Sequence, residues 1–78
     1  MSSEAERIFF SICEQASKKD WEVISADVEI IGDKKESVVK ELIENGLIEK
    51  VENIGQHYIR CQITLAGRTC FYRTKKVE

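Results

Sequence analysis

The chain has 78 residues, of which 42% are hydrophobic and 33% are charged, and its formal net charge is −2. These proportions are typical of a soluble globular protein and exclude an intrinsically disordered chain, and the length predicts one small domain over residues 1–78. No apolar run approaches the roughly 20 residues that cross a bilayer. The N-terminus lacks the pattern of a signal peptide, so we expect a cytoplasmic protein.

The residues that bind metals or perform catalysis are sparse. Three cysteines, Cys13, Cys61 and Cys70, form no CxxC pair, and His57 is the single histidine. A zinc site needs closely spaced ligand pairs, so we expect free thiols and neither a metal nor another cofactor. A Gly-rich phosphate loop and the GxSxG and HExxH motifs are also missing, so we expect no enzymatic activity.

Charge is distributed unevenly along the chain. Residues 1–33 carry three basic and eight acidic side chains, a net charge of −5, whereas residues 34–78 carry nine basic and six acidic side chains, a net charge of +3. Local potential, more than net charge, steers a polyanion. The C-terminal part is therefore compatible with a basic binding face as well as with an ordinary mixed surface.

The first predicted element is a helix over residues 4–18. Ser3 and Glu6 have the spacing of a capping box at its start, and apolar residues then recur at helical spacing along one stripe. Phe10 lies off that stripe. It therefore either widens the core face of the helix or is an exposed anchor for a partner.

A short strand and a short helix are predicted next. Trp21–Ile24 is rich in β-prone residues. Ser25 is a suitable cap for a helix of about two turns over residues 26–31, which would end at Gly32.

The central predicted helix covers residues 34–45. Asp33 is a suitable N-cap, apolar residues between positions 38 and 43 keep one stripe hydrophobic, and Gly46 supplies the stop. Together with the short helix before it, this helix predicts a helix-turn-helix.

Strand patterns follow the central helix. Residues 49–54 and 57–63 predict a β-hairpin around Gly55, and the second of them alternates with the period of a half-buried strand. Residues 69–74 are as β-prone as any part of the chain, so a third strand is one possibility for this segment.

Two short motifs resemble those of winged helix-turn-helix domains. Gly46-Leu47-Ile48 at the end of the central helix resembles the passage from a recognition helix into the first wing strand. The run ITLAGR, from Ile63 to Arg68, resembles the strand-to-helix junction of the MarR and PadR types of winged-helix regulator. This resemblance implies that Thr64 caps a helix over residues 65–73, with a third strand over residues 69–74 as the open alternative. The sequence is thus similar to a small α+β winged helix-turn-helix domain of order α-β-α-α-β-β-α.

This resemblance implies a small, dimeric transcriptional regulator that binds double-stranded DNA. Helix 34–45 would lie in the major groove, and hairpin 48–63 would be the wing. The implied DNA-binding residues are polar side chains of the helix start, the wing turn and the outer strand face: Lys34, Lys35, Ser37, Lys40, Gln56, His57 and Arg60.

Acidic residues weigh against DNA binding. Glu36, Glu41 and Glu44 lie on the same helix, where a carboxylate facing the groove would be repelled by phosphate. The alternative is a protein–protein docking or dimerisation module without DNA binding, because a fold does not fix a function. Aromatic residues anchor such interfaces, and the candidates for a dimer interface are Phe10, Phe71 and Tyr72.

Overall fold

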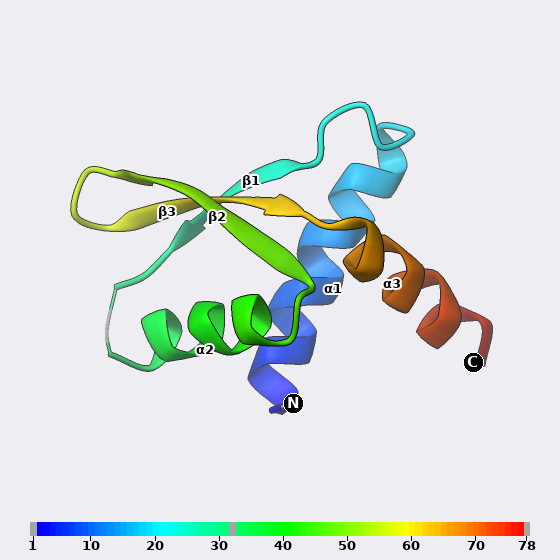
Figure 1. The fold of residues 1–78 in the computed structure, drawn as a ribbon, viewed down its shortest axis with the longest axis horizontal. Helices are drawn as coiled ribbons and strands as arrows, with labels where there is room; N and C mark the ends of the chain where they lie inside the picture. The colour runs from blue at the N-terminus through cyan, green and yellow to red at the C-terminus, as the bar shows by residue number, and fades with distance from the viewer. Residues whose placement is uncertain (1, 32, 78) are drawn as a thin grey trace.

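The computed structural model of the chain describes residues 2–31 and 33–77. The described residues form three helices and a three-stranded antiparallel sheet: α1 (Ser3–Lys18), β1 (Ser25–Glu29), α2 (Asp33–Glu44), β2 (Ile48–Ile54), β3 (Tyr58–Ile63) and α3 (Leu65–Val77) (Figure 1). In the sheet the strand order is β1-β3-β2, with both neighbours antiparallel to β3. No helix in these ranges is long and apolar enough to cross a membrane.

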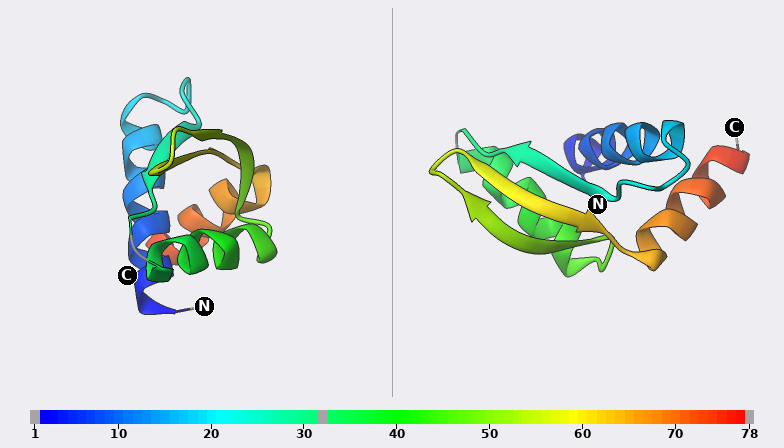
Figure 2. Two further views of the ribbon diagram at one scale, coloured as in Figure 1. Left: turned by 90° about the vertical axis from the view of Figure 1, so that its left-hand side faces the viewer. Right: turned by 90° about the horizontal axis from the view of Figure 1, so that it is seen from above.

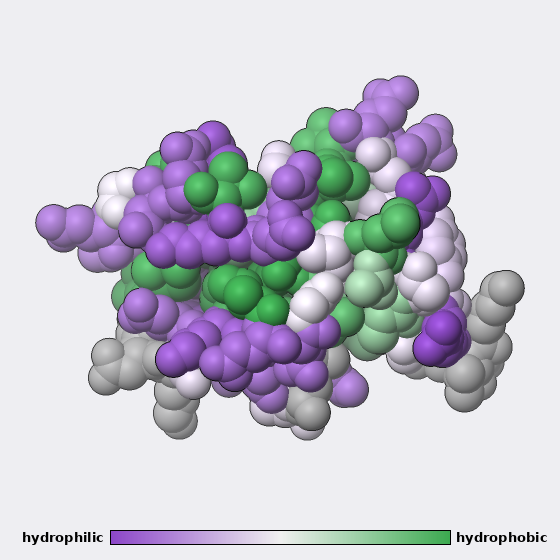
Figure 3. Space-filling model, viewed as in Figure 1, coloured by the Kyte–Doolittle hydropathy of each residue, from purple (hydrophilic) through white to green (hydrophobic). Residues whose placement is uncertain are grey.

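The helices gather on one side of the sheet (Figure 2). Alternation along β3 explains this arrangement, because Ile59, Cys61 and Ile63 are buried while the residues between them face outward. In the space-filling view, hydrophilic side chains cover β2 and α2, and a hydrophobic strip lies between the two (Figure 3). The sheet therefore has one packed face and one face open to water.

Residues 25–31 differ most from the prediction. Ser25–Glu29 is strand β1, so the predicted helix over 26–31 is wrong, and its predicted end at Gly32 lies outside the described residues. The predicted strand over Trp21–Ile24 is also wrong, because these residues form a turn, a bend and an irregular segment that leads to β1. Val28 pairs with Ile59 in the ladder between β1 and β3, which includes every residue of β1. A two-turn helix has few internal hydrogen bonds, whereas the ladder satisfies backbone groups on both strands.

This correction changes the architecture. The element order is α-β-α-β-β-α, and within the described residues α2 is preceded by a strand and not by a helix. The predicted helix-turn-helix is therefore not formed in this part of the chain. What the structure establishes is a small α+β domain with a three-stranded sheet.

The other predicted helices and the hairpin are confirmed, with shifted ends. The cap of α1 is Ser2 and not Ser3, since the Ser2 hydroxyl oxygen accepts a hydrogen bond of 3.2 Å from the Ala5 N–H. Helix α3 extends to Val77, beyond the predicted end, and the alternative strand over 69–74 is wrong. Helix periodicity thus prevails over the β propensity of this segment.

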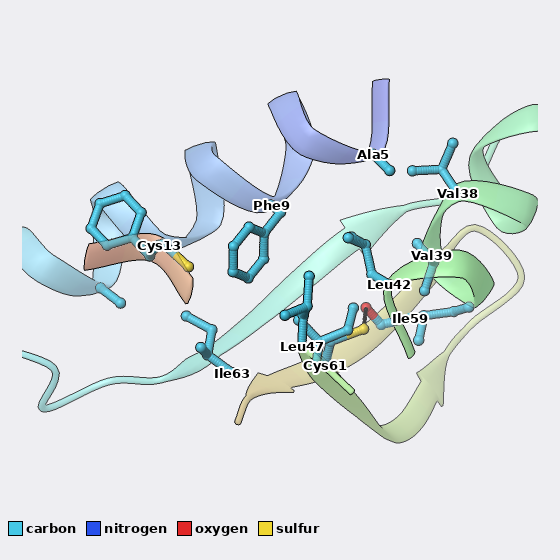
Figure 4. Close-up of a cluster of buried hydrophobic side chains, with 13 residues drawn as sticks. Ala5, Phe9, Cys13, Val38, Val39, Leu42, Leu47, Ile59, Cys61 and Ile63 are labelled. Atoms are coloured by element: carbon cyan, nitrogen blue, oxygen red, sulfur yellow. Dashed lines mark hydrogen bonds between the residues drawn. The ribbon is translucent and has the colours of Figure 1, made fainter. Parts of the chain in front are cut away.

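The core lies between the packed face of the sheet and the three helices (Figure 4). Phe9 from α1, Leu42 from α2 and Phe71 from α3 are at most 1% exposed. Burying side chains of this size stabilises a fold by about 1.5–3 kcal/mol each. Each of the three helices therefore packs one face against the sheet.

The end of α2, the base of the hairpin and the start of α3 meet at one junction. The Thr64 hydroxyl donates to the carbonyl oxygen of Gly46 at 2.6 Å, and the Thr64 N–H donates to that of Leu47 at 3.1 Å. The same hydroxyl oxygen accepts from the Gly67 N–H at 2.9 Å, which caps α3. A Cβ on Gly67 would collide with the Leu47 carbonyl oxygen, so only glycine fits there.

We predict that Gly67→Ala destabilises the domain by about 1–3 kcal/mol, because backbone must move to admit the methyl group. Gly46→Ala is the control, since Gly46 has a φ of 73° but open space around it. Left-handed strain alone should cost about 1 kcal/mol there. Urea unfolding of both variants measures the difference, and a Gly67→Ala protein as stable as wild type would show that α3 does not approach Leu47 this closely.

Candidate nucleic-acid interface

The start of α2 and the turn of the hairpin lie at the same end of the molecule. The Ile30 N–H, just after β1, donates a 2.7 Å hydrogen bond to the carbonyl oxygen of His57 in that turn. Helix α2 begins three residues later, at Asp33, and three residues reach at most about 11 Å. Figure 1 shows both features at the end opposite the C-terminus.

The candidate DNA-binding residues of α2 do not all face one way. Ser37 and Lys40 are exposed and, being three residues apart, lie on the same side of the helix. Lys35 is half-buried and lines a groove beside α1. Lys34 falls in α2, but its side chain lies outside the described part of the structure.

The acidic side chains of α2 also differ in their surroundings. The Glu41 carboxylate accepts hydrogen bonds of 2.9 and 3.0 Å from the N–H and the hydroxyl of Ser2. It therefore binds the start of α1 and is turned away from the outer side of α2. Glu36 and Glu44 are exposed.

In the hairpin, Gln56 and His57 are exposed at the turn, while Arg60 is held by carboxylates on both sides. Its Nε lies 2.8 Å from Oδ1 of Asp27 on β1, and its Nη1 lies 3.1 Å from Oε1 of Glu52 on β2. The hydrogen bond from Arg60 lowers the pKa of Asp27. A guanidinium so engaged is a poor phosphate ligand, and sequence reasoning did not find its cross-strand partners.

The open face of the sheet is acidic. The register and the alternation place four carboxylates on this face, from Asp27, Glu29, Glu49 and Glu52, against the single guanidinium of Arg60. This excess of negative charge repels a polyanion. Of the candidate DNA-binding residues, those of α2 and of the hairpin turn lie off this face.

The candidate dimer residues belong to an aromatic cluster between α1, α3 and the turn after α1. Phe71 is 1% exposed and Phe10 is half-buried, with their ring centroids 5.8 Å apart, so both are part of the packed interior. Tyr72 is 41% exposed. Of the three, only Tyr72 presents a substantial surface.

Trp21 joins this cluster in a way the sequence did not indicate. Its Nε1–H donates to the Tyr72 hydroxyl at 2.8 Å, and the Arg68 guanidinium lies 4.8 Å from its ring centroid. Asp20 and Trp21 both have positive φ, 53° and 60°. These contacts offset a backbone conformation that costs non-glycine residues roughly 1–2 kcal/mol each.

The three cysteines are free thiols, and two of them are buried. Cys13 and Cys61 are buried, and burial, with a smaller effect of Cys70, raises the pKa of the Cys13 thiol to about 12. Within residues 2–31 and 33–77, no three His, Cys, Asp or Glu side chains are grouped so as to hold a metal ion.

Comparisons with family models, with curated proteins and with solved structures each found no match to this chain. Its interpretation therefore depends on the residues themselves.

We predict that the Asp27 carboxyl titrates below its ordinary pKa of 3.8, because Arg60 stabilises the charged form. A carboxyl group whose pKa is lowered by folding stabilises the fold at pH values above its ordinary pKa. This contribution to stability is lost as the pH falls through the lowered pKa. NMR titration of the side-chain carboxyl carbon measures this. Arg60→Gln should return the pKa towards 3.8, and an Asp27 that titrates normally in the wild type would mean that the ion pair does not persist in solution.

Proposed function

We propose that this protein binds double-stranded DNA as a small winged-helix module, with α2 in the major groove and the β2–β3 hairpin as the wing. The observation that supports this most is the hydrogen bond between Ile30 and His57, which keeps the start of α2 close to the hairpin turn. A helix and a hairpin turn presented at one end can contact a groove and its flanking backbone together.

Helix α2 has features that suit such a contact. The major groove is about 12 Å wide and admits one helix, and the unpaired N–H groups of a helix start attract phosphate. Lys40 and Ser37 add a cation and a hydrogen-bonding group on the exposed side of α2. Glu41, which would oppose phosphate, is engaged by Ser2.

The acidic face of the sheet favours one orientation of a bound DNA duplex relative to the domain. Its four carboxylates would repel a duplex laid across the strands. They are compatible with a duplex at the α2 end, where contact by the wing is limited to its turn, at Gln56 and His57. We therefore leave Arg60 out of the proposed contact.

The relation to winged-helix domains is itself part of the proposal. From α2 onward, the order of helix, two strands and helix follows the expected pattern. Before α2, strand β1 takes the place of the first helix of a helix-turn-helix. We propose that pairing of β1 with β3 now supports α2, since it holds Ile30 at the hairpin turn.

We predict that Lys35→Gln with Lys40→Gln weakens binding to random-sequence duplex DNA and reduces the slope of log affinity against log salt by up to about 2, one unit for each lost phosphate contact. Fluorescence anisotropy at several salt concentrations measures both quantities. The matched control is Lys18→Gln with Lys19→Gln at the end of α1, which removes the same charge elsewhere.

The control should retain most of the wild-type affinity and slope. Equal losses in the two double variants would mean that only net charge matters, and would contradict the assignment of α2. A wild-type protein that fails to bind DNA even at low salt would refute the proposed function.

A second candidate function is protein docking, with another copy of this chain as the partner. Leu65 is 81% exposed and Tyr72 is 41% exposed. Being seven residues apart, they lie on the same side of α3. An exposed leucine beside a tyrosine suits an interface better than a solvated surface, and the corresponding C₂ contact would be self-complementary.

We predict that the wild-type protein sediments as a dimer at micromolar concentration and that Leu65→Lys shifts it to a monomer, because a charge would enter the interface. Analytical ultracentrifugation measures the mass. Thr69→Lys, one turn away on the same helix, tests how far the interface extends. A wild-type monomer at high concentration would contradict this assignment.

A further inference from the structure

A groove runs along α1 and the outer edge of the sheet. Its volume is about 430 Å³, and it is lined by one side of α1, by β1 and by Lys35 of α2. Ile8 and Ile12 from α1 and Val28 from β1 supply apolar lining, and all three are half-buried. The groove thus combines these apolar side chains with charged and polar ones from the same elements, and a strand bounds it on one side.

That strand has an unpaired edge. Within the described residues β1 is the outermost strand, with β3 as its one neighbour in the sheet. The Ile63 N–H of β3 donates to the Ile24 carbonyl oxygen at 2.9 Å, and the Ile30 N–H donates at 2.7 Å to the carbonyl oxygen of His57, the residue before β3. In an antiparallel ladder alternate residues face the partner strand, so the N–H and C=O groups of residues 25, 27 and 29 point to the open edge.

We propose that this groove binds an extended peptide that adds to the sheet as a fourth strand beside β1. Strand addition to an exposed sheet edge uses backbone hydrogen bonds for affinity and alternate side chains for specificity. The open-edge groups of residues 25, 27 and 29 supply the hydrogen bonds. Ile8, Ile12 and Val28 supply contacts for every second side chain of the peptide.

The charges of β1 define the chemistry of the peptide. The remaining peptide side chains would lie on the open face of the sheet, next to Asp27 and Glu29. This face carries four carboxylates and one guanidinium, so lysine or arginine is favoured at those positions. The expected ligand is therefore an extended segment in which apolar and basic residues alternate.

The same charges disfavour a second copy of β1 as the occupant. Antiparallel pairing of two β1 strands centred on Asp27 would place Asp27 opposite itself, and like charges directly opposite are destabilising. A basic partner segment meets no such repulsion. The groove shares Lys35 with the proposed DNA contact. The edge of β1 and the lining from α1 take no part in that contact, so the inference does not depend on DNA binding.

The test uses a capped synthetic peptide that alternates lysine and valine over seven residues, titrated into the isotope-labelled full chain. We expect NMR shift changes at the amides of residues 25, 27 and 29 and at the methyl groups of Ile8 and Ile12. A peptide of the same composition with its valines adjacent should bind at least about tenfold more weakly. Equal affinity for the two peptides would mean that charge attraction alone accounts for binding, and would overturn the proposal.

Removing hydrogen bonds tests the strand addition itself. A peptide N-methylated at its lysines, whose N–H groups would face β1, should lose about tenfold or more in affinity for the wild-type chain. In the protein, Asp27→Pro removes an edge N–H at a position where proline is tolerated, and Asp27→Asn is the matched control that retains it. Binding unaffected by N-methylation, or shift changes away from β1 and α1, would overturn the proposal.

Discussion

The contact on which the rest of this structure depends is the junction of Leu47, Thr64 and Gly67. Thr64 bonds through its backbone to Leu47, and through its hydroxyl to Gly46 and Gly67. It thereby fixes the end of α2, the base of the hairpin and the start of α3 relative to one another. The two motifs that suggested a winged helix, GLI and ITLAGR, are the two halves of this one contact, which gives their spacing a physical reason.

From this junction α2 and the hairpin run to the other end of the molecule, where Ile30, three residues before α2 begins, bonds to His57 in the hairpin turn. The hairpin is thus attached to the segment that leads into α2, and strand β1 is part of this second attachment. The open face of the sheet is acidic, whereas α2 carries lysines and carboxylates side by side. The proposed nucleic-acid contact therefore depends on the position of α2 beside the hairpin turn more than on net charge.

Periodicity was sufficient to predict α1, α2 and the hairpin, because each of these elements shows a clear 3.6- or 2-residue pattern. Helix α3 was predicted from the resemblance of the ITLAGR run, with a strand over residues 69–74 as the alternative. It was insufficient for β1, where a few apolar residues suit a helix or a strand and the ladder with β3 decides between them. The site was less predictable still. The pairing of Arg60 with Asp27 depends on strand register, and the burial of Phe71 depends on how α3 packs, neither of which is visible in local sequence.

The most direct test of the proposed function is an NMR titration of the labelled chain with a random-sequence DNA duplex at low salt. The proposal predicts amide shift changes concentrated at residues 35–40 of α2 and at residues 55–57 of the hairpin turn, with little change across the acidic face of β1. Shift changes confined to α3, or spread over the outer sheet face, would contradict it and would require a different surface for DNA.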